Sequence, residues 1–159
     1  MLTKLEQARD TWGGSHTAID GWLAERQHLI VQYCKLAGMP PYDQERKLLP
    51  SRDVLENFCE VLVDYVSAGH FEVYDQIVAQ CTINGDRNMA LAQQIHPRLT
   101  DTTDAALEFN DRYADHYDSE QLDEFYRDLT ALGRALETRF ALEDQMIATL
   151  HRDHVNATA

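Results

Sequence analysis

Apolar residues recur at steps of three and four along almost the whole chain, and this spacing limits the fold more than any other feature of the sequence. We find no sustained period-2 alternation bounded by hairpin turns. Four amphipathic stretches of about 25 to 35 residues, joined by short turns, predict an all-α protein: an antiparallel bundle of four long helices, roughly 40 to 45 Å in length. The 159 residues suit a single helical domain over 1–159, with a core at about 12–152 and short frayed ends.

The first two helices are predicted from their apolar stripes and from the residues that flank them. The first helix begins near Ser15 and ends at Gly38, ahead of a Pro-Pro pair. Its stripe consists of Ile19, Trp22, Leu23, Ile30, Tyr33 and Ala37. The second helix begins at Ser51 or Asp53. Its stripe consists of Val54, Phe58, Val61, Leu62 and Tyr65.

The second helix is expected to be interrupted at Ser67-Ala68-Gly69. Serine competes for backbone hydrogen bonds, and glycine costs about 1 kcal/mol inside a helix. Helical spacing then resumes as far as the turn at 84–86, with Phe71, Tyr74, Ile77, Val78 and Cys81.

The third and fourth helices are longer. The third is predicted from about Arg87 to Ala114, kinked or broken near Pro97, which removes one backbone hydrogen bond. Its stripe stays in phase across that proline: Ile95, Leu99, Thr102, Ala106, Phe109 and Tyr113. The fourth is capped by Asp118-Ser119 and is expected to end at about Arg152. Its stripe is Leu122, Phe125, Leu129, Leu132, Leu136, Phe140, Ile147 and Leu150.

The net charge narrows the classes of partner. The chain has 27 Asp and Glu against 14 Lys and Arg, a formal net charge of −13. This charge disfavours binding to nucleic-acid phosphates and to anionic membranes, and it favours attraction to a basic partner. Between Asp101 and Asp128 ten carboxylates face only two basic side chains, Arg112 and Arg127. That tract is either a solvated polar surface or a docking surface for a basic protein.

The sequence favours a cytoplasmic protein. The first ten residues alternate charged and apolar side chains, unlike a signal peptide, and no apolar run approaches the ~18 to 20 residues of a membrane span. Cys34, Cys59 and Cys81 are odd in number and far apart, so we expect reduced core residues rather than disulfides or a zinc site.

Sequence motifs for catalysis or metal binding are weak in this chain. A di-iron bundle needs two inward Glu-x-x-His pairs, and only Glu25 and His28 form one. At 100° per residue, His28 lies about 160° from the centre of its helix's apolar stripe, so it should face water. The chain contains no P-loop, no G-x-G-x-x-G and no nucleophile elbow.

Four charged side chains lie on or beside apolar stripes. Arg26 and Glu143 are in the middle of stripes, His70 falls on the apolar side of its segment, and Asp64 lies beside one. Charges on a core face must be paired or must reach solvent. Three interpretations of this set are therefore open. The residues form a buried network that sets helix register, they form a functional pocket, or they are long side chains that extend to solvent.

Several stretches resemble one known family. The string Asp64-Tyr65-Val66-Ser67-Ala68-Gly69-His70-Phe71 is long and unusual, and it resembles the signature of the Rsd/AlgQ family, the regulators of sigma D. Three further stretches agree: Trp12-Gly13-Gly14 with the segment 19–26, the segment 106–113, and the segment 135–144. Trp12-Gly13-Gly14 and Glu108-Phe109-Asn110-Asp111-Arg112-Tyr113 look more like the AlgQ branch.

The resemblance implies a non-enzymatic, all-helical transcription regulator without a cofactor. Members of the family bind the primary (housekeeping) sigma factor of bacterial RNA polymerase, chiefly its region 4, and so act as anti-sigma factors. The AlgQ branch is also associated with alginate and siderophore genes. Some members are linked to the phosphocarrier protein HPr, which makes HPr a second expected partner.

The resemblance also implies a set of partner-binding residues. They are Trp22, Arg26, Asp64, Ser67, Gly69, His70, Phe71 and Tyr74. Two other interpretations remain open from the residues alone. One is a small-molecule sensor or an enzyme that uses the Arg26/His70/Glu143 cluster, and the other is a helical adaptor for other basic proteins.

Overall fold

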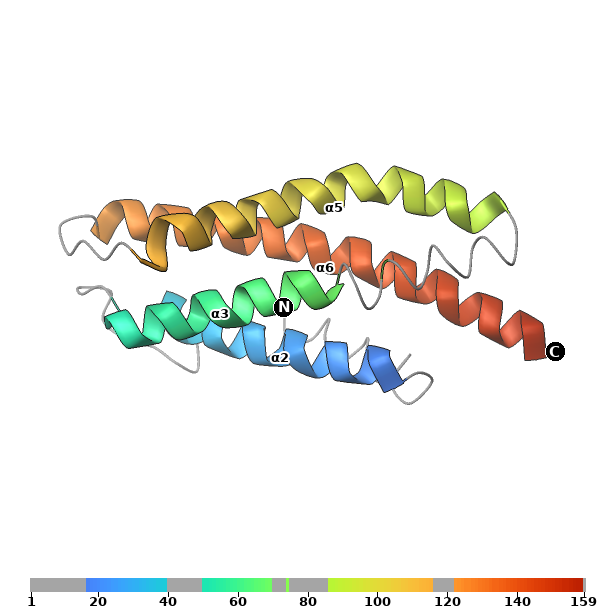
Figure 1. The fold of residues 1–159 in the computed structure, drawn as a ribbon, viewed down its shortest axis with the longest axis horizontal. Coiled ribbons are helices and arrows are strands. Elements are labelled where there is room, and N and C mark those ends of the chain that lie inside the picture. The colour runs from blue at the N-terminus through green and yellow to red at the C-terminus, as the bar shows by residue number, and fades with distance from the viewer. Residues whose placement is uncertain (1–16, 40–49, 70–73, 75–85, 116–121, 159) are drawn as a thin grey trace.

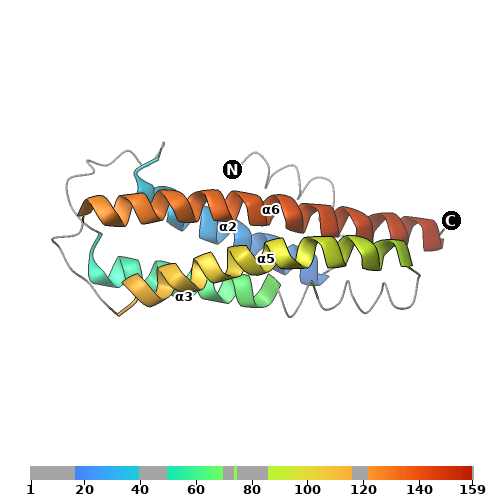
Figure 2. The ribbon, with the colours of Figure 1, turned by 90° about the horizontal axis from the view of Figure 1, so that it is seen from above.

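The computed structural model is a bundle of long helices (Figures 1 and 2). It describes residues 17–39, 50–69, 74, 86–115 and 122–158. Within these ranges the elements are α2 (Thr17–Ala37), α3 (Arg52–Ala68), α5 (Asp86–Tyr113) and α6 (Leu122–Thr158), and no strand is found among them. The prediction of an all-α bundle is confirmed. None of the helices described is long and apolar enough to cross a membrane.

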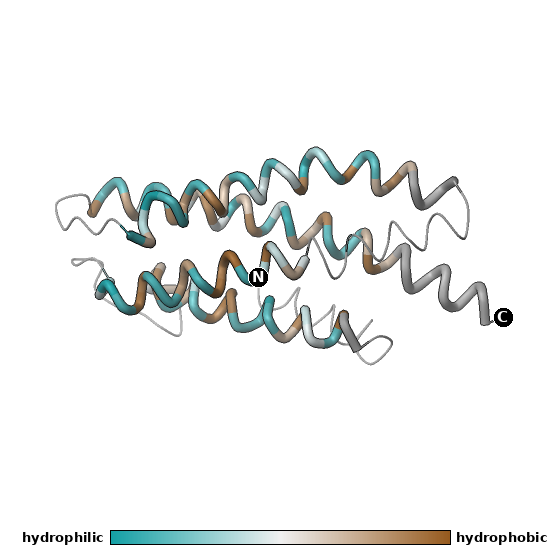
Figure 3. The backbone as a smooth tube through the Cα atoms, in the orientation of Figure 1, coloured by the Kyte–Doolittle hydropathy of each residue, from teal (hydrophilic) through white to brown (hydrophobic). Residues whose placement is uncertain are grey.

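The helices form a closed ring of contacts. In Figure 1, α5 and α6 lie side by side above α3 and α2. The helices α5 and α6, α2 and α3, α3 and α5, and α2 and α6 pack against one another. Each helix therefore packs against two others, and the buried apolar side chains of all four form one core. Hydrophobic residues recur along each helix between hydrophilic ones (Figure 3).

The ends of α2 and α3 follow their local sequence. Gly38 adopts a positive φ of 64°, as a glycine after a helix end often does. Its N–H donates to the Lys35 carbonyl at 3.3 Å, and the Met39 N–H donates to the Cys34 carbonyl at 3.0 Å, which together make a Schellman motif. Ser51 caps the start of α3, because its hydroxyl accepts the Val54 N–H at 3.4 Å.

Other helix boundaries differ in part from the prediction. The helix α3 ends at Ala68, inside the predicted interruption. By contrast, α5 runs through Pro97 without a break. Because proline has no N–H, the Gln93 carbonyl lacks its usual helical hydrogen bond. Gln93 and Pro97 are both exposed, so water can donate to this carbonyl instead. The helix α6 extends to Thr158, beyond the predicted end at Arg152. Ser15, the Asp118-Ser119 cap, and the segment predicted to follow Gly69, apart from Tyr74, lie outside the described residues.

The core is made of the predicted stripes. All six stripe residues of α2 and all six of α5 are buried. On α3, Val54 is 45% exposed, because it lies at the edge of a buried stripe that runs through Leu55, Phe58, Cys59 and Leu62; its assignment to the core was wrong. Cys34 and Cys59 are buried free thiols, as predicted, and Cys81 lies outside the described residues. Burial raises the pKa of Cys59 to about 12, which keeps this thiol protonated and unreactive.

Candidate functional site

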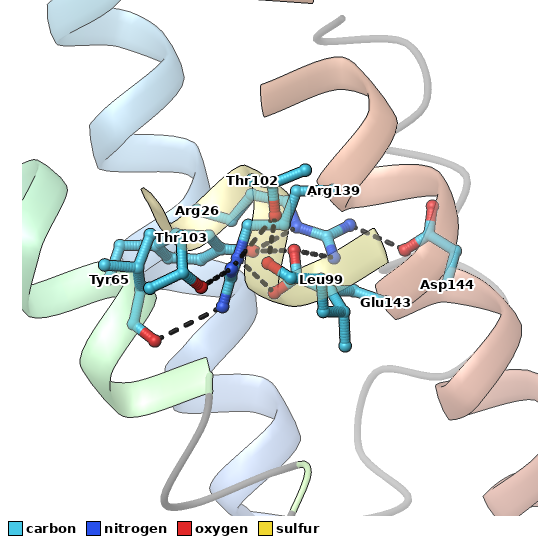
Figure 4. A network of polar contacts seen from close by, with 9 residues as sticks. Arg26, Tyr65, Leu99, Thr102, Thr103, Arg139, Glu143 and Asp144 are labelled. Carbon is cyan, nitrogen blue, oxygen red and sulfur yellow. Dashed lines mark hydrogen bonds and ion pairs between the residues drawn. The ribbon is translucent and has the colours of Figure 1, made fainter. Parts of the chain in front are cut away.

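A cluster of charged side chains crosses the middle of the bundle (Figure 4). Arg26 of α2 is 1% exposed, and its Nη1 donates to Asp144 Oδ1 of α6 at 2.7 Å. Its Nε donates to the Tyr65 hydroxyl of α3 at 3.0 Å, and that hydroxyl donates to Glu143 Oε1 at 2.7 Å. Arg26 Nη2 also lies 3.6 Å from Glu143 Oε1. Tyr65 therefore links a buried guanidinium to a buried carboxylate between three helices.

A second arginine extends the cluster to α5. Arg139 is 2% exposed, and its Nη1 donates to the hydroxyls of Thr103 at 2.7 Å and Thr102 at 3.2 Å. Its Nη2 donates to the carbonyl of Val66 in α3 at 3.2 Å, and its Nε lies 3.4 Å from Glu143 Oε2. Since Arg139 and Glu143 are four residues apart on α6, helical spacing alone places them together. The cluster now joins all four helices described.

Aromatic rings flank the Arg26 guanidinium. The guanidinium carbon of Arg26 lies 5.0 Å from the ring centres of Trp22 and of Phe140, one on α2 and one on α6. Trp22 stacks on Tyr65 with 5.7 Å between ring centres, and Tyr65 meets Phe140 edge to face. The apolar walls exclude water, so the ion pairs are screened much less than surface pairs.

Gly69 closes one side of the cluster. Within the part of the chain that the structure describes, Trp22 Nε1 and Glu143 Oε2 are buried without a hydrogen-bond partner. A β-carbon on Gly69 would lie 3.1 Å from Glu143 Oε2, 3.2 Å from Arg139 Nη2 and 3.3 Å from Trp22 Nε1. Gly69 adopts ordinary helical angles, so its role is close approach rather than an unusual backbone conformation.

Burial and charge pairing shift the pKa values of the cluster. Burial raises the pKa of Glu143, although Arg139 and Arg26 oppose this effect. Burial by itself lowers the pKa of Arg26, but Tyr65, Glu143 and Asp144 outweigh it and the net shift is upward. Burial and the nearby Glu143 carboxylate raise the pKa of Tyr65 well above its ordinary value. Arg26 and Tyr65 therefore keep their protons at all physiological pH values.

The cluster is built to hold its own charges rather than a substrate. Two arginines face two carboxylates, so the set is balanced in charge. The nearest cavity, lined in part by Gly69, Thr103, Arg139 and Glu143, has about 20 Å³, which is room for a single water molecule. Among the described residues no group of three or more His, Cys, Asp or Glu side chains is placed to hold a metal ion. The geometry is that of a buried polar network whose charges are paired with one another.

The predicted site residues fall into three groups: buried, exposed or half-buried, and outside the described residues. Trp22, Arg26 and Gly69 are buried, so a partner cannot touch them while the bundle is closed. Asp64 and Ser67 are exposed, and Tyr74 is half-buried with its ring 5.1 Å from that of His96. The predicted membership of Asp64 in the buried cluster was wrong, because two residues after Leu62 the helix has turned to solvent. His70 and Phe71 lie outside the described residues.

Sequence reasoning did not place Arg139, Asp144, Thr102 or Thr103 in the cluster, and it assigned Tyr65 to an apolar stripe. Arg139 lies three residues after Leu136 and four before Glu143, in phase with the buried stripe of α6. This spacing could have predicted from the sequence that Arg139 is buried. Thr102 was assigned to the core as part of the α5 stripe, and its hydroxyl contact with Arg139 depends on the register between two helices. His28 is exposed, as its angle on α2 predicted.

A groove of about 310 Å³ between α5 and α6 is a second feature of the molecule. We call it the α5/α6 groove and define it by its lining residues, which are Ala105, Glu108, Phe109, Arg112, Tyr113, Asp128, Ala131 and Leu132. At one end, Arg112 Nη1 donates to Asp128 Oδ2 at 2.6 Å, and the Tyr113 hydroxyl donates to the same oxygen. The groove lies within the acidic tract singled out in the sequence.

Comparison with known proteins gives one consistent family. The sequence model of the family described as "Regulator of RNA polymerase sigma(70) subunit, Rsd/AlgQ" matches residues 1–151. Proteins named "Regulator of sigma D" from Yersinia pseudotuberculosis (strain YPIII) and Yersinia enterocolitica are 40% and 42% identical over 148 and 149 residues. These matches cover 92% of this chain and 87% and 88% of the two relatives.

The same name is carried by a relative from Salmonella paratyphi B, 38% identical over 148 residues, with 92% of this chain and 90% of the relative covered. Nearly the full length of each relative is therefore aligned with this chain. The fold expected from the resemblance and the fold observed are both all-α. The chain belongs to the Rsd/AlgQ family of regulators of the sigma(70) subunit of RNA polymerase.

Proposed function

We propose that this protein binds the primary (housekeeping) sigma factor of its own bacterial RNA polymerase, chiefly through region 4, and sequesters it as an anti-sigma factor in the cytoplasm. The observation that carries this proposal is the family match over residues 1–151, together with relatives named for the regulation of sigma D. HPr is kept as a second predicted partner on the family resemblance alone.

The charge of the chain supports a basic protein target. A DNA-reading domain carries Lys and Arg because it must meet phosphates. A protein of net charge −13 attracts such a surface and competes with DNA for it. Eight carboxylates face three basic side chains over the neighbouring segments 101–115 and 122–134 of α5 and α6. The acids are Asp101, Asp104, Glu108, Asp111, Asp115, Asp123, Glu124 and Asp128, and the bases are Arg112, Arg127 and Arg134.

The interior supports regulation by binding rather than by catalysis. The charged groups of the cluster already pair with one another, and the cavity beside them has room for one water molecule. A substrate pocket typically encloses several hundred Å³ with polar groups directed into it. The function therefore belongs to the outer surface of the bundle.

Titration calorimetry with the isolated region 4 of the primary sigma factor, at two salt concentrations, tests the proposal. We expect saturable 1:1 binding that weakens at the higher salt, because the attraction is between complementary charges. Region 4 of an alternative sigma factor is the specificity control, and we expect much weaker binding to it. The absence of heat and of a complex on gel filtration at both salt concentrations would contradict the proposal.

A further inference from the structure

The α5/α6 groove has an apolar floor, with Glu108 on one side and Asp128, which pairs with Arg112, on the other. Phe109 of α5 and Leu132 of α6 are buried at its base. Ala105 and Ala131 contribute only methyl groups to its walls, so a side chain from outside can reach the floor. The volume of about 310 Å³ is at the lower limit for a small-molecule pocket and fits one or two inserted side chains.

The two sides of the groove present carboxylates that have spare acceptor capacity. Arg112 and Tyr113 both donate to Oδ2 of Asp128, which holds the carboxylate in place, and Oδ1 accepts no hydrogen bond from any residue that the structure describes. Asp128 is a quarter exposed. Across the groove, Glu108 is exposed and forms no ion pair with a described residue. Two helices thus place one acidic group on each side of an apolar floor.

This combination matches the shape and polarity of a long basic side chain. Arginine and lysine bury an aliphatic stem along apolar surface while their charged heads remain at a polar edge. A guanidinium that reaches two carboxylates makes charge-assisted hydrogen bonds, which are stronger than neutral ones. Asp101 and Asp104, which lie nearby on α5, add to the negative potential around the groove.

We propose that the α5/α6 groove is the docking surface for a basic helix of the sigma factor's DNA-binding region, which inserts one arginine or lysine between Glu108 and Asp128. This inference rests on the proposed function and names the surface that carries it. A second copy of this chain is a poor occupant, because each copy carries a net charge of −13 and would bring its own carboxylates to this face.

The test uses the full chain and the primary sigma factor, with two pairs of matched variants. Glu108→Lys reverses a charge in the groove, and Glu60→Lys makes the same change at an exposed position of α3. Ala131→Trp fills the groove, and Ala24→Trp adds the same ring to an exposed position of α2. All four positions face solvent or the groove, so melting curves should stay close to that of the wild type and confirm folding.

We expect Glu108→Lys and Ala131→Trp each to weaken sigma binding by about tenfold or more, whereas Glu60→Lys and Ala24→Trp change it by less than about threefold. If the wild type binds sigma and both groove variants bind it as tightly as the wild type does, the docking surface lies elsewhere and the proposed function stands. Equal weakening by Glu108→Lys and Glu60→Lys, with no effect of Ala131→Trp, would show general charge attraction and overturn the groove. If the wild type itself does not bind sigma, the proposed function fails and the inference fails with it.

Discussion

Gly69 lies so close to Glu143 that a β-carbon at position 69 would stand 3.1 Å from the carboxylate oxygen Oε2. Gly21 of α2 is the matched opposite, since a β-carbon there would meet nothing within 4 Å. Both glycines have helical backbone conformations, but Gly69 closes a buried cluster and Gly21 faces solvent. The same substitution should therefore change stability in opposite directions at the two positions.

We expect Gly69→Ala to lower the free energy of unfolding by about 1–3 kcal/mol, because the added methyl group forces Glu143, Arg139 or Trp22 to shift. We expect Gly21→Ala to raise it by roughly 0.5–1 kcal/mol, the usual gain of alanine over glycine inside a helix. Urea unfolding of both variants checks the pair. Stabilisation by Gly69→Ala would contradict the close packing described for that site.

Removal of Arg26 should destabilise the protein strongly. Arg26→Met leaves Glu143 with Arg139 as its remaining basic neighbour, and deletion of one partner of a buried ion pair costs about 3–5 kcal/mol. Arg52→Met is the control, because Arg52 pairs with Glu56 on the surface and its loss should leave the melting temperature nearly unchanged. A melting temperature for Arg26→Met at or above that of the wild type would show that the buried pair does not stabilise the fold.

The Tyr65 hydroxyl should contribute more to the free energy of unfolding than the hydroxyl of Tyr33, which is also buried. Tyr65→Phe leaves Arg26 Nε without its acceptor and Glu143 Oε1 without its donor, so we expect a loss of about 1.5–3 kcal/mol, as for hydrogen bonds to charged groups. Tyr33→Phe removes one hydrogen bond to the Leu129 carbonyl, at 2.8 Å, and should cost about 1 kcal/mol. Chemical denaturation of the two variants side by side measures the difference, and equal losses would argue against the bridging role of Tyr65.

The raised pKa of Glu143 predicts a pH dependence of stability. The folded chain holds the Glu143 proton more tightly than the unfolded chain, in which this group titrates near its ordinary value of 4.5. As the pH rises from that value through the raised pKa, the wild type should therefore lose stability relative to Glu143→Gln, which has no proton to lose. Urea unfolding at steps between pH 4 and pH 8 measures this difference. A difference that stays constant, or that grows in favour of the wild type, would contradict the direction of the shift.

Much of the fold could be predicted from the sequence, because helical burial depends on spacing. The stripes of α2 and α5 are buried as predicted, and the Gly38 and Ser51 boundaries follow from local capping chemistry. Val54 was misplaced because the buried stripe of α3 runs through Leu55 and Cys59, which the sequence analysis left out, so that Val54 lies at the edge of the stripe. The end of α6 was underestimated because the last residues carry no apolar stripe or stop signal.

The candidate site was predictable only in part. Arg26 and Glu143 were identified because each lies in phase with apolar residues on its own helix. Their connection through Tyr65, and the contact of Arg139 with Thr103, depend on how the helices are aligned along their axes. A single sequence carries no direct signal for that alignment. The α5/α6 groove was likewise visible only as an acidic tract, without the apolar floor that gives it a shape.

The most direct test of the account measures whether this protein removes the primary sigma factor from RNA polymerase. Fluorescently labelled sigma factor is mixed with core polymerase at equilibrium, and the protein is added in increasing amounts while the fraction of polymerase-bound sigma is followed. The account predicts that this fraction falls as the protein approaches saturation, and that Glu108→Lys shifts the curve to higher concentrations than Glu60→Lys does. A fraction of bound sigma that does not change at any concentration of added protein would contradict it.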